Sequence, residues 1–289
     1  MLESSSEEYP EAVAPALTVE QAIANLNHED LSLRYYAAWW LGRFRVREQA
    51  AVAALIAALS DEDYRTELGD YPLRRNAARA LGKLGDRQAV PGLLRCLDCS
   101  DFYVREAAAQ SLGMLGDPTA IPRLMQLLAG GVAAAVQVPG RPHLTQPYEA
   151  VVEALGSLQA TDAVSLIEPF LEHPVARVQY AALRAMYQLT QNDAYGQRLV
   201  QALEGSDLKL RRVALADLGA IGYLPAADAI ASASVENSFK LIALKGLLEH
   251  EINEVNAAAA GARQQNVDSA QPHLSDAAIQ VMNLMDSLL

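Results

Sequence analysis

A short motif recurs along most of this 289-residue chain and constrains its fold more than any other feature. The motif has an Arg preceded by Leu or Val, Ala three or four residues later, and Leu-Gly at offsets seven and eight. Four clear copies place their Arg at positions 34, 74, 105 and 211, and weaker copies place Tyr148, Gln179 and Lys240 there. The basic period is about 31 residues, lengthened by insertions at residues 60–71 and 129–147.

The motif has the pattern of one face of an α-helix, because offsets 3, 4 and 7 fall on the same side. Ala on this face permits close approach of a neighbouring helix, and we expect Gly at offset 8 to act as a C-cap. Amphipathic stretches precede the motif helices, for example at residues 50–59, 90–97 and 121–128. The sequence therefore predicts an all-α, HEAT-like α-solenoid, a right-handed superhelix of about seven two-helix repeats.

The repeats divide the chain into three parts. We expect an acidic, flexible N-terminus at residues 1–16, a repeat solenoid at 17–251 and a helical C-terminal tail at 252–289. In the tail, residues 253–267 and 274–289 have helical patterns, with a linker at 268–272. The insertion at 129–147 is rich in Gly and Pro, and either a functional loop or a tolerated surface excursion fits that composition.

The charge and cysteine content exclude several classes of protein. A net charge of -12 disfavours nucleic acid as the main partner, because phosphate binding needs cationic side chains. Two Cys suit a reducing compartment. The N-terminus lacks the basic and apolar regions of a signal peptide, and no segment approaches the roughly 18 apolar residues of a membrane span. We expect a cytoplasmic protein with no membrane span.

The sequence lacks a strong motif for metal binding or nucleophilic catalysis. Cys96 and Cys99 form a single CxxC without a second pair, which favours a buried turn over a zinc site. His28 and His250 each precede a Glu, but they occupy different positions relative to the motif and do not form a matched metal site. GxSxG, P-loop and dinucleotide fingerprints are absent from the sequence. We therefore predict no metal site.

The positions at offsets 1, 5 and 9 lie away from the Ala face, and we expect them to line the concave surface. They are aromatic and basic in the first third of the solenoid, and this combination suits a flat, conjugated, anionic ligand. The alternative is structural: Trp40 packs between helices and the Arg side chains form ion pairs between repeats. The candidate ligand-binding residues are Tyr35, Trp39, Arg43, Arg75, Arg79 and Lys83. The recurring anchor Arg residues are expected to bond neighbouring turns.

Three segments also resemble one family. Residues 31–45 with their Tyr-Tyr and Trp-Trp pairs, residues 71–85, and residues 135–150 in the second insertion are similar to the E-type subunit of the cyanobacterial E/F phycocyanobilin lyases. The likeness extends over about residues 17–249. It implies a heterodimer with the F-type lyase subunit, itself a HEAT-repeat protein, that attaches phycocyanobilin by a thioether bond to a cysteine of the phycocyanin alpha subunit.

The resemblance also implies roles for the groove residues. Phycocyanobilin is an open-chain tetrapyrrole with two propionates, so the groove Arg and Lys side chains become propionate partners and the aromatic ones stack on pyrrole rings. The catalytic residues stay unknown, and the candidates for a carboxylate near the pyrrole nitrogens are Glu106, Glu149 and Asp217. The bilin would be a substrate, with no tightly bound cofactor. The alternative function is a non-catalytic HEAT-repeat adaptor, or a protein that carries or detaches bilin in phycobilisomes.

Overall fold

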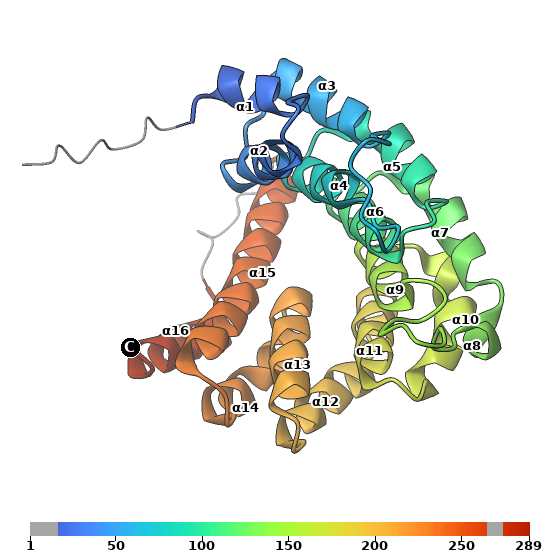
Figure 1. Ribbon diagram of the computed structural model, residues 1–289. Helices are drawn as coiled ribbons and strands as arrows, with labels where there is room; N and C mark the ends of the chain where they lie inside the picture. The colour runs from blue at the N-terminus through green and yellow to red at the C-terminus, as the bar shows by residue number, and fades with distance from the viewer. Residues whose placement is uncertain (1–16, 265–273) are drawn as a thin grey trace, which may run out of the picture.

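The helices form one curved solenoid. The computed structural model describes residues 17–264 and 274–289, so the expected acidic N-terminus lies outside the described residues. Sixteen α-helices follow one another within those ranges, and they bend into a ring that is open on one side (Figure 1). The two ends of the described chain lie on either side of that opening, near α1 and α16 (Figure 1). The expected all-α, HEAT-like solenoid is confirmed.

The ring has two layers, because each repeat contributes one inner and one outer helix. Each inner helix packs on the next inner helix along the chain. The inner layer consists of the seven motif helices, α2 (Leu31–Arg43), α4 (Pro72–Leu84), α6 (Phe102–Leu115), α9 (Tyr148–Ser157), α11 (Ala176–Thr190), α13 (Leu208–Ile221) and α15 (Asn237–Gln264). The outer layer consists of α1 (Val19–Asn25), α3 (Gln49–Ala58), α5 (Val90–Cys96), α7 (Ile121–Leu128), α10 (Val164–Ile167), α12 (Asp193–Gln201) and α14 (Ala227–Ser232). These seven pairs are the seven predicted repeats.

The anchor arginines tie each motif helix to neighbouring turns. Arg105 donates hydrogen bonds from Nη1 to the carbonyl oxygen of Cys99 at 2.7 Å and from Nη2 to that of Thr145 at 3.1 Å. Arg211 similarly bonds the carbonyl oxygens of Gly205 and Ser234 at 2.6 and 3.1 Å. Charged donors satisfy turn carbonyls that no helix would otherwise bond. The predicted structural role of the anchors is confirmed.

The Gly at offset 8 has a different role from the one expected. Gly113 lies within α6 and faces the next motif helix, where an added Cβ would approach the Cα of Ala154 to 2.9 Å. The equivalent Gly42 would bring a Cβ to 2.8 Å from the Cα of Ala80. These contacts leave no room for a side chain, so Gly sets the spacing between inner helices. The C-cap prediction is therefore wrong.

The helix C-caps lie three residues further along the chain. Gly85 and Gly116 end α4 and α6 in the left-handed conformation, with φ of 78° and 63°. Only Gly adopts this conformation without steric cost. At the other end, Asp101 caps α6 by accepting a hydrogen bond from the backbone N–H of Tyr103 at 2.7 Å, as its place before the motif predicts.

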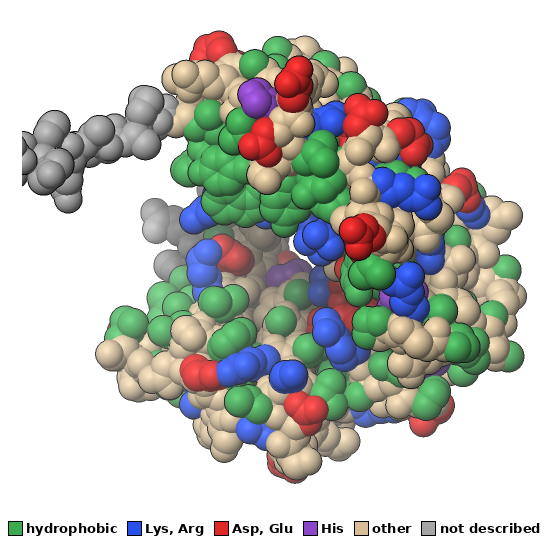
Figure 2. All heavy atoms as spheres, viewed as in Figure 1, with side chains coloured by type: hydrophobic (Ala, Val, Ile, Leu, Met, Phe, Trp, Pro, Cys, Tyr) green, Lys and Arg blue, Asp and Glu red, His purple; other side chains and the backbone are tan. Residues whose placement is uncertain are grey.

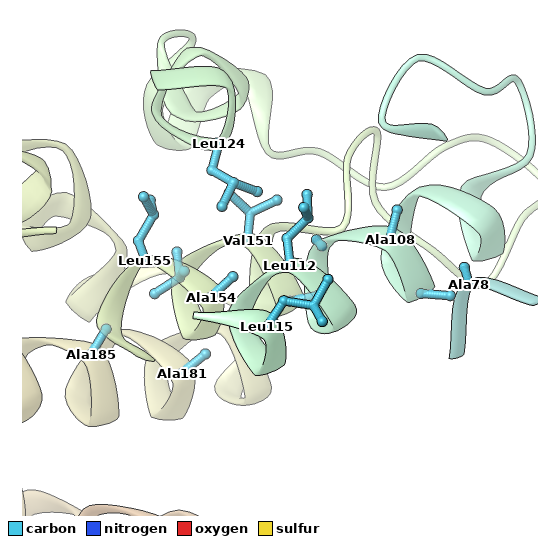
Figure 3. Close-up of a cluster of buried hydrophobic side chains, with 14 of the residues drawn as sticks. Ala78, Ala108, Leu112, Leu115, Leu124, Val151, Ala154, Leu155, Ala181 and Ala185 are labelled. Carbon is cyan, nitrogen blue, oxygen red and sulfur yellow. The ribbon is translucent and has the colours of Figure 1, made fainter. Parts of the chain in front are cut away.

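The hydrophobic core lies between the two layers of the ring. Leu124 of the outer helix α7 points toward the inner helices, where Leu112 of α6 and Val151 and Leu155 of α9 converge on it (Figure 3). All four side chains are fully buried. Ala80 and Ala154 lie between successive inner helices, where they face Gly42 and Gly113, so each inner helix contacts both its inner and its outer neighbours.

The C-terminal part of the chain extends the ring beyond the last repeat. α15 runs through residue 251 without a break, so the predicted division between solenoid and tail falls inside one helix. The predicted linker lies outside the described residues. α16 (Asp276–Ser287) packs against α14 and α15, and Gln280 donates hydrogen bonds to the Asp228 carboxylate at 3.0 Å. The separation of a tail from the solenoid stays a prediction.

The two insertions meet at one edge of the ring. The second insertion contains the short helix α8 (Gly131–Ala134) and an antiparallel bridge between Gln137 and Leu144. Arg141 at its tip donates a hydrogen bond of 3.5 Å to the carbonyl oxygen of Leu68 in the first insertion. Both segments therefore stand beside the N-terminal ends of the inner helices, at the rim of the concave surface.

Candidate functional site

The concave surface begins with an aromatic patch on α2. The Trp39 side chain is 44% exposed and stacks on Tyr36, with ring centroids 5.5 Å apart. Tyr35 is half-buried, and its carbonyl oxygen accepts a hydrogen bond from Asn76 at 3.3 Å. Trp40 is half-buried and packs on Phe44, the C-cap residue of the same helix, with ring centroids 4.8 Å apart. Hydrophobic side chains gather at this end of the ring (Figure 2).

The basic candidates follow on α2 and α4. Arg43, Arg79 and Lys83 are exposed, and Lys and Arg side chains surround the central hollow (Figure 2). Arg79 approaches Glu106 of the next inner helix to 3.8 Å. Arg75 is half-buried with its guanidinium 5.8 Å from the centre of the Tyr103 ring, and its buried Nε has no hydrogen-bond partner. The predicted basic positions therefore lie on the adjacent inner helices α2 and α4.

Two of the candidate carboxylates share a pocket of about 270 Å³ between α6, α9, α11 and the second insertion. Burial raises the pKa of Glu106, while the nearby Arg79 opposes the shift. Glu149 accepts hydrogen bonds from Arg177 of α11, the shorter at 2.8 Å. The pocket wall includes His143 of the insertion, which stacks on Phe102 with ring centroids 4.2 Å apart.

The third candidate, Asp217, lies further along the ring on α13. Its side chain is 4% exposed and accepts a hydrogen bond from Arg184 at 3.3 Å. The same Arg184 nitrogen is 3.9 Å from a carboxylate oxygen of Glu153 on α9. Burial raises the pKa of Asp217 to about 6 and that of Glu153 to about 7, against the opposing effect of Arg184. Asp217 is therefore part of a second acidic centre.

The two acidic centres form a continuous charged band across the inner helices. Glu149 and Glu153 lie one turn apart on α9, and the Glu149 charge contributes to the raised pKa of both Glu153 and Asp217. The positive charge of Arg177 has the opposite effect on both. The structure thus brings Glu106, Glu149 and Asp217 into one electrostatic system, although they come from three different helices.

Several residues of this surface escape the sequence analysis. Arg177 and Tyr103 each lie two residues before an anchor position, that is, at offset -2. Offset -2 is three residues before offset 1, so it falls on the same helical face as the groove positions. Extending the groove pattern by one turn toward the N-terminus would have found them. His143 carries no such signal, because its position depends on how the insertion folds over α6.

The described residues contain no group of three or more His, Cys, Asp or Glu side chains placed to hold a metal ion. Cys96 is buried, which raises the pKa of its thiol to about 11, and the Cys99 sulfur is 4.0 Å from a guanidinium nitrogen of Arg74. Within the same residues no helix combines the length and the apolar character that crossing a membrane demands.

Comparison with known proteins identifies the family. Residues 66–137 match the model of HEAT repeats, and residues 33–61 match the model of the PBS lyase HEAT-like repeat. The chain is 69% identical over all 289 residues to phycocyanobilin lyase subunit alpha of Nostoc sp., with both chains covered completely. The corresponding protein of Synechocystis sp. is 57% identical and covers 95% of this chain and 97% of its own.

The similarity extends to a relative with a different name and to a solved structure. Bilin biosynthesis protein PecE of Nostoc sp. is 48% identical and covers 83% of this chain and 89% of its own. A solved complex of CpcE and CpcF of phycocyanin lyase from Nostoc sp. contains a chain that matches this one with a TM-score of 0.85 and 68% identity, over 99% of this chain and 100% of that chain. The resemblance found in the sequence is confirmed, and the chain belongs to the family of phycocyanobilin lyase alpha subunits.

Proposed function

We propose that this chain is one subunit of a heterodimeric bilin lyase that attaches phycocyanobilin to phycocyanin. The observation that carries the proposal is the full-length match, at 69% identity, to a protein named as the alpha subunit of phycocyanobilin lyase. The solved relative is one of two different subunits in a complex, which supports an F-type subunit as the partner of this chain. The acceptor is a cysteine of the phycocyanin alpha subunit.

The charge distribution of the groove matches the chemistry of this substrate. A tetrapyrrole with two propionates presents anionic groups on one edge and pyrrole nitrogens on the other. Arg75, Arg79, Lys83 and Arg43 provide cations for the propionates on the α2–α4 side. Tyr35 and Trp39 supply ring faces for stacking, and the exposed Trp39 is the better placed of the two.

The carboxylates on the following inner helices suit the pyrrole nitrogens. Glu106 and Glu149 line the pocket next to the basic side chains, and Asp217 belongs to the adjoining acidic centre. A carboxylate beside the nitrogens accepts their N–H hydrogen bonds and stabilises a protonated, cationic bilin. Anionic propionates and a cationic core would thus each meet side chains of opposite charge on neighbouring inner helices.

The reaction needs little covalent chemistry from this chain. The acceptor thiol adds across a carbon–carbon double bond of the bilin, so that sulfur bonds to one carbon and a proton to its neighbour, without a leaving group. The nucleophile belongs to phycocyanin. The lyase contributes orientation, by holding the bilin in one conformation and presenting the reacting carbon to the thiol, and it contributes control of protons.

Co-expression tests the function directly. The chain is produced with an F-type lyase subunit, phycocyanobilin and the phycocyanin alpha subunit, and pigment is measured on the denatured alpha subunit. The proposal predicts acid-stable, covalently attached colour that requires both lyase subunits. Pigment binding without attachment would support a carrier, and absence of both binding and attachment would leave the HEAT-repeat adaptor.

A further inference from the structure

The acidic centre around Arg184 has a feature that the functions proposed above do not use. Its two carboxyl groups, Glu153 and Asp217, approach the same Nη1 atom of the Arg184 guanidinium, but at unequal distances. Asp217 accepts a hydrogen bond from Arg184 at 3.3 Å, whereas the Glu153 oxygen is 3.9 Å away, beyond hydrogen-bond distance. One guanidinium carries a single charge and pairs with the nearer carboxylate. Asp217 is therefore the ionised partner, and Glu153 is left without one.

Glu153 is also the carboxyl group that faces the groove. Its side chain is 24% exposed, compared with 4% for Asp217. It lies in a pocket of about 300 Å³ on the concave surface between α6, α9 and α11. The remaining lining residues of that pocket are Gln110, Gly113, Met114, Ala150, Ala154, Ser157 and Arg184. A ligand in the groove can reach Glu153, whereas Asp217 is covered.

The surroundings of Glu153 favour its neutral form. Burial contributes most, and the negative charges of Asp217 on α13 and Glu149 on α9 act in the same direction. The cations Arg184 and Arg177 of α11 oppose them and do not prevail, since the pKa of Glu153 rises to about 7. At neutral pH a large fraction of Glu153 therefore carries a proton, in contact with the pocket, beside an ionised neighbour.

Unbonded polar atoms gather around this centre. Three buried atoms, Arg184 Nε, Gln188 Oε1 and Asp217 Oδ2, make no hydrogen bond, and their residues lie on the adjacent helices α11 and α13. An unmade hydrogen bond of a buried group costs about 1–3 kcal/mol. Such clusters of unbonded polar atoms are typical of functional sites.

We propose, resting on the lyase function above, that Glu153 donates a proton to the basic, imine-type nitrogen of the bound tetrapyrrole. The carboxyl O–H bond breaks, an N–H bond forms, and the resulting cation lies beside the Glu153 carboxylate. Asp217 is a positioning residue, because it holds Arg184 and so keeps Glu153 protonated until the bilin is bound. A donor whose acidity matches the working pH transfers a proton in either direction at low cost.

A pH titration of bound pigment tests the proposal. The complex of this chain with the F-type subunit is loaded with phycocyanobilin, without acceptor protein, and the visible absorption band of the protonated bilin is followed as pH rises. We expect Glu153→Gln to bind bilin and to lose this band at a pH lower than wild type by about one unit or more. Glu153→Asp, which keeps an acid at the site, restores most of the shift.

Two further variants separate donation from structure. Asp217→Asn frees Arg184 to pair with Glu153, so the band is lost at lower pH although the donor is intact. Gln110→Ala alters the same pocket without a titrating group and leaves the midpoint where it is in wild type. If Glu153→Gln binds bilin with the wild-type midpoint, the proton-donor role is refuted while the lyase function stands. If the wild-type complex binds no bilin, both proposals are overturned.

Discussion

The contact between Gly113 of α6 and Ala154 of α9 makes a quantitative prediction about stability. In Gly113→Ala the new Cβ would lie 2.9 Å from the Cα and 3.2 Å from the Cβ of Ala154. Ala is better than Gly in a helix interior by about 1 kcal/mol. Overpacking costs roughly 1–3 kcal/mol, and the upper value applies because the opposing atoms belong to a helix backbone that cannot rotate away.

The net expectation for Gly113→Ala is a loss of about 2 kcal/mol of folding free energy, the difference between these two effects. For a chain of 289 residues that corresponds to a Tm lower by about 3 °C. Thermal unfolding followed by far-ultraviolet circular dichroism measures it. Met114→Ala is the matched control, since this neighbouring side chain is 59% exposed and its loss should change the free energy by less than about 0.5 kcal/mol. A Tm for Gly113→Ala equal to or above that of wild type would refute the close-packing argument.

Three further predictions concern single side chains. Arg105→Met should lose roughly 1.5–3 kcal/mol of stability in urea unfolding, because its carbonyl partners are left unbonded, and an unchanged midpoint would contradict the anchor role. Trp39→Ala and Arg79→Ala should each slow bilin transfer while helical circular dichroism is retained; an equal loss of helicity would indicate a structural role. Glu153→Gln should make stability less dependent on pH. Since the folded pKa of Glu153 is raised, wild type is stabilised below about pH 4.5 and loses up to about 3 kcal/mol as pH rises through 7, so melts at pH 5 and 8 should diverge more for wild type than for the variant.

The repeat made the fold predictable, because each local pattern is tested seven times along the chain. The anchor arginines illustrate this, since a residue that recurs at one offset in a helix has the same neighbours in every repeat. The role of Gly at offset 8 was not predictable in the same way. A Gly near the end of a helical pattern fits either a cap or a close contact, and only the position of the next inner helix decides between them.

The candidate site was only partly predictable. Helical periodicity predicts Tyr35, Trp39 and Arg79 on the concave face, and in the structure Trp39 and Arg79 are exposed whereas Tyr35 is half-buried. It does not reveal that Arg184 lies nearer to Asp217 than to Glu153, because the three residues are on three helices and a difference of 0.6 Å decides the pairing. Relations between repeats of unequal sequence depend on packing details that one-dimensional patterns do not contain.

The second insertion has a consequence for how a ligand enters the groove. Its backbone is held at several points, including the carbonyl oxygen of Ala135, which the fully buried His173 contacts at 3.0 Å, and that of Thr145, which is bonded by Arg105. Thr145 in turn donates a hydrogen bond of 2.6 Å to the carbonyl oxygen of Ala134. These hydrogen bonds fix the segment at both ends, so it forms a rigid wall of the pocket. We therefore expect a ligand to reach the pocket beside Glu106 and Glu149 from the open centre of the ring, without displacement of the insertion.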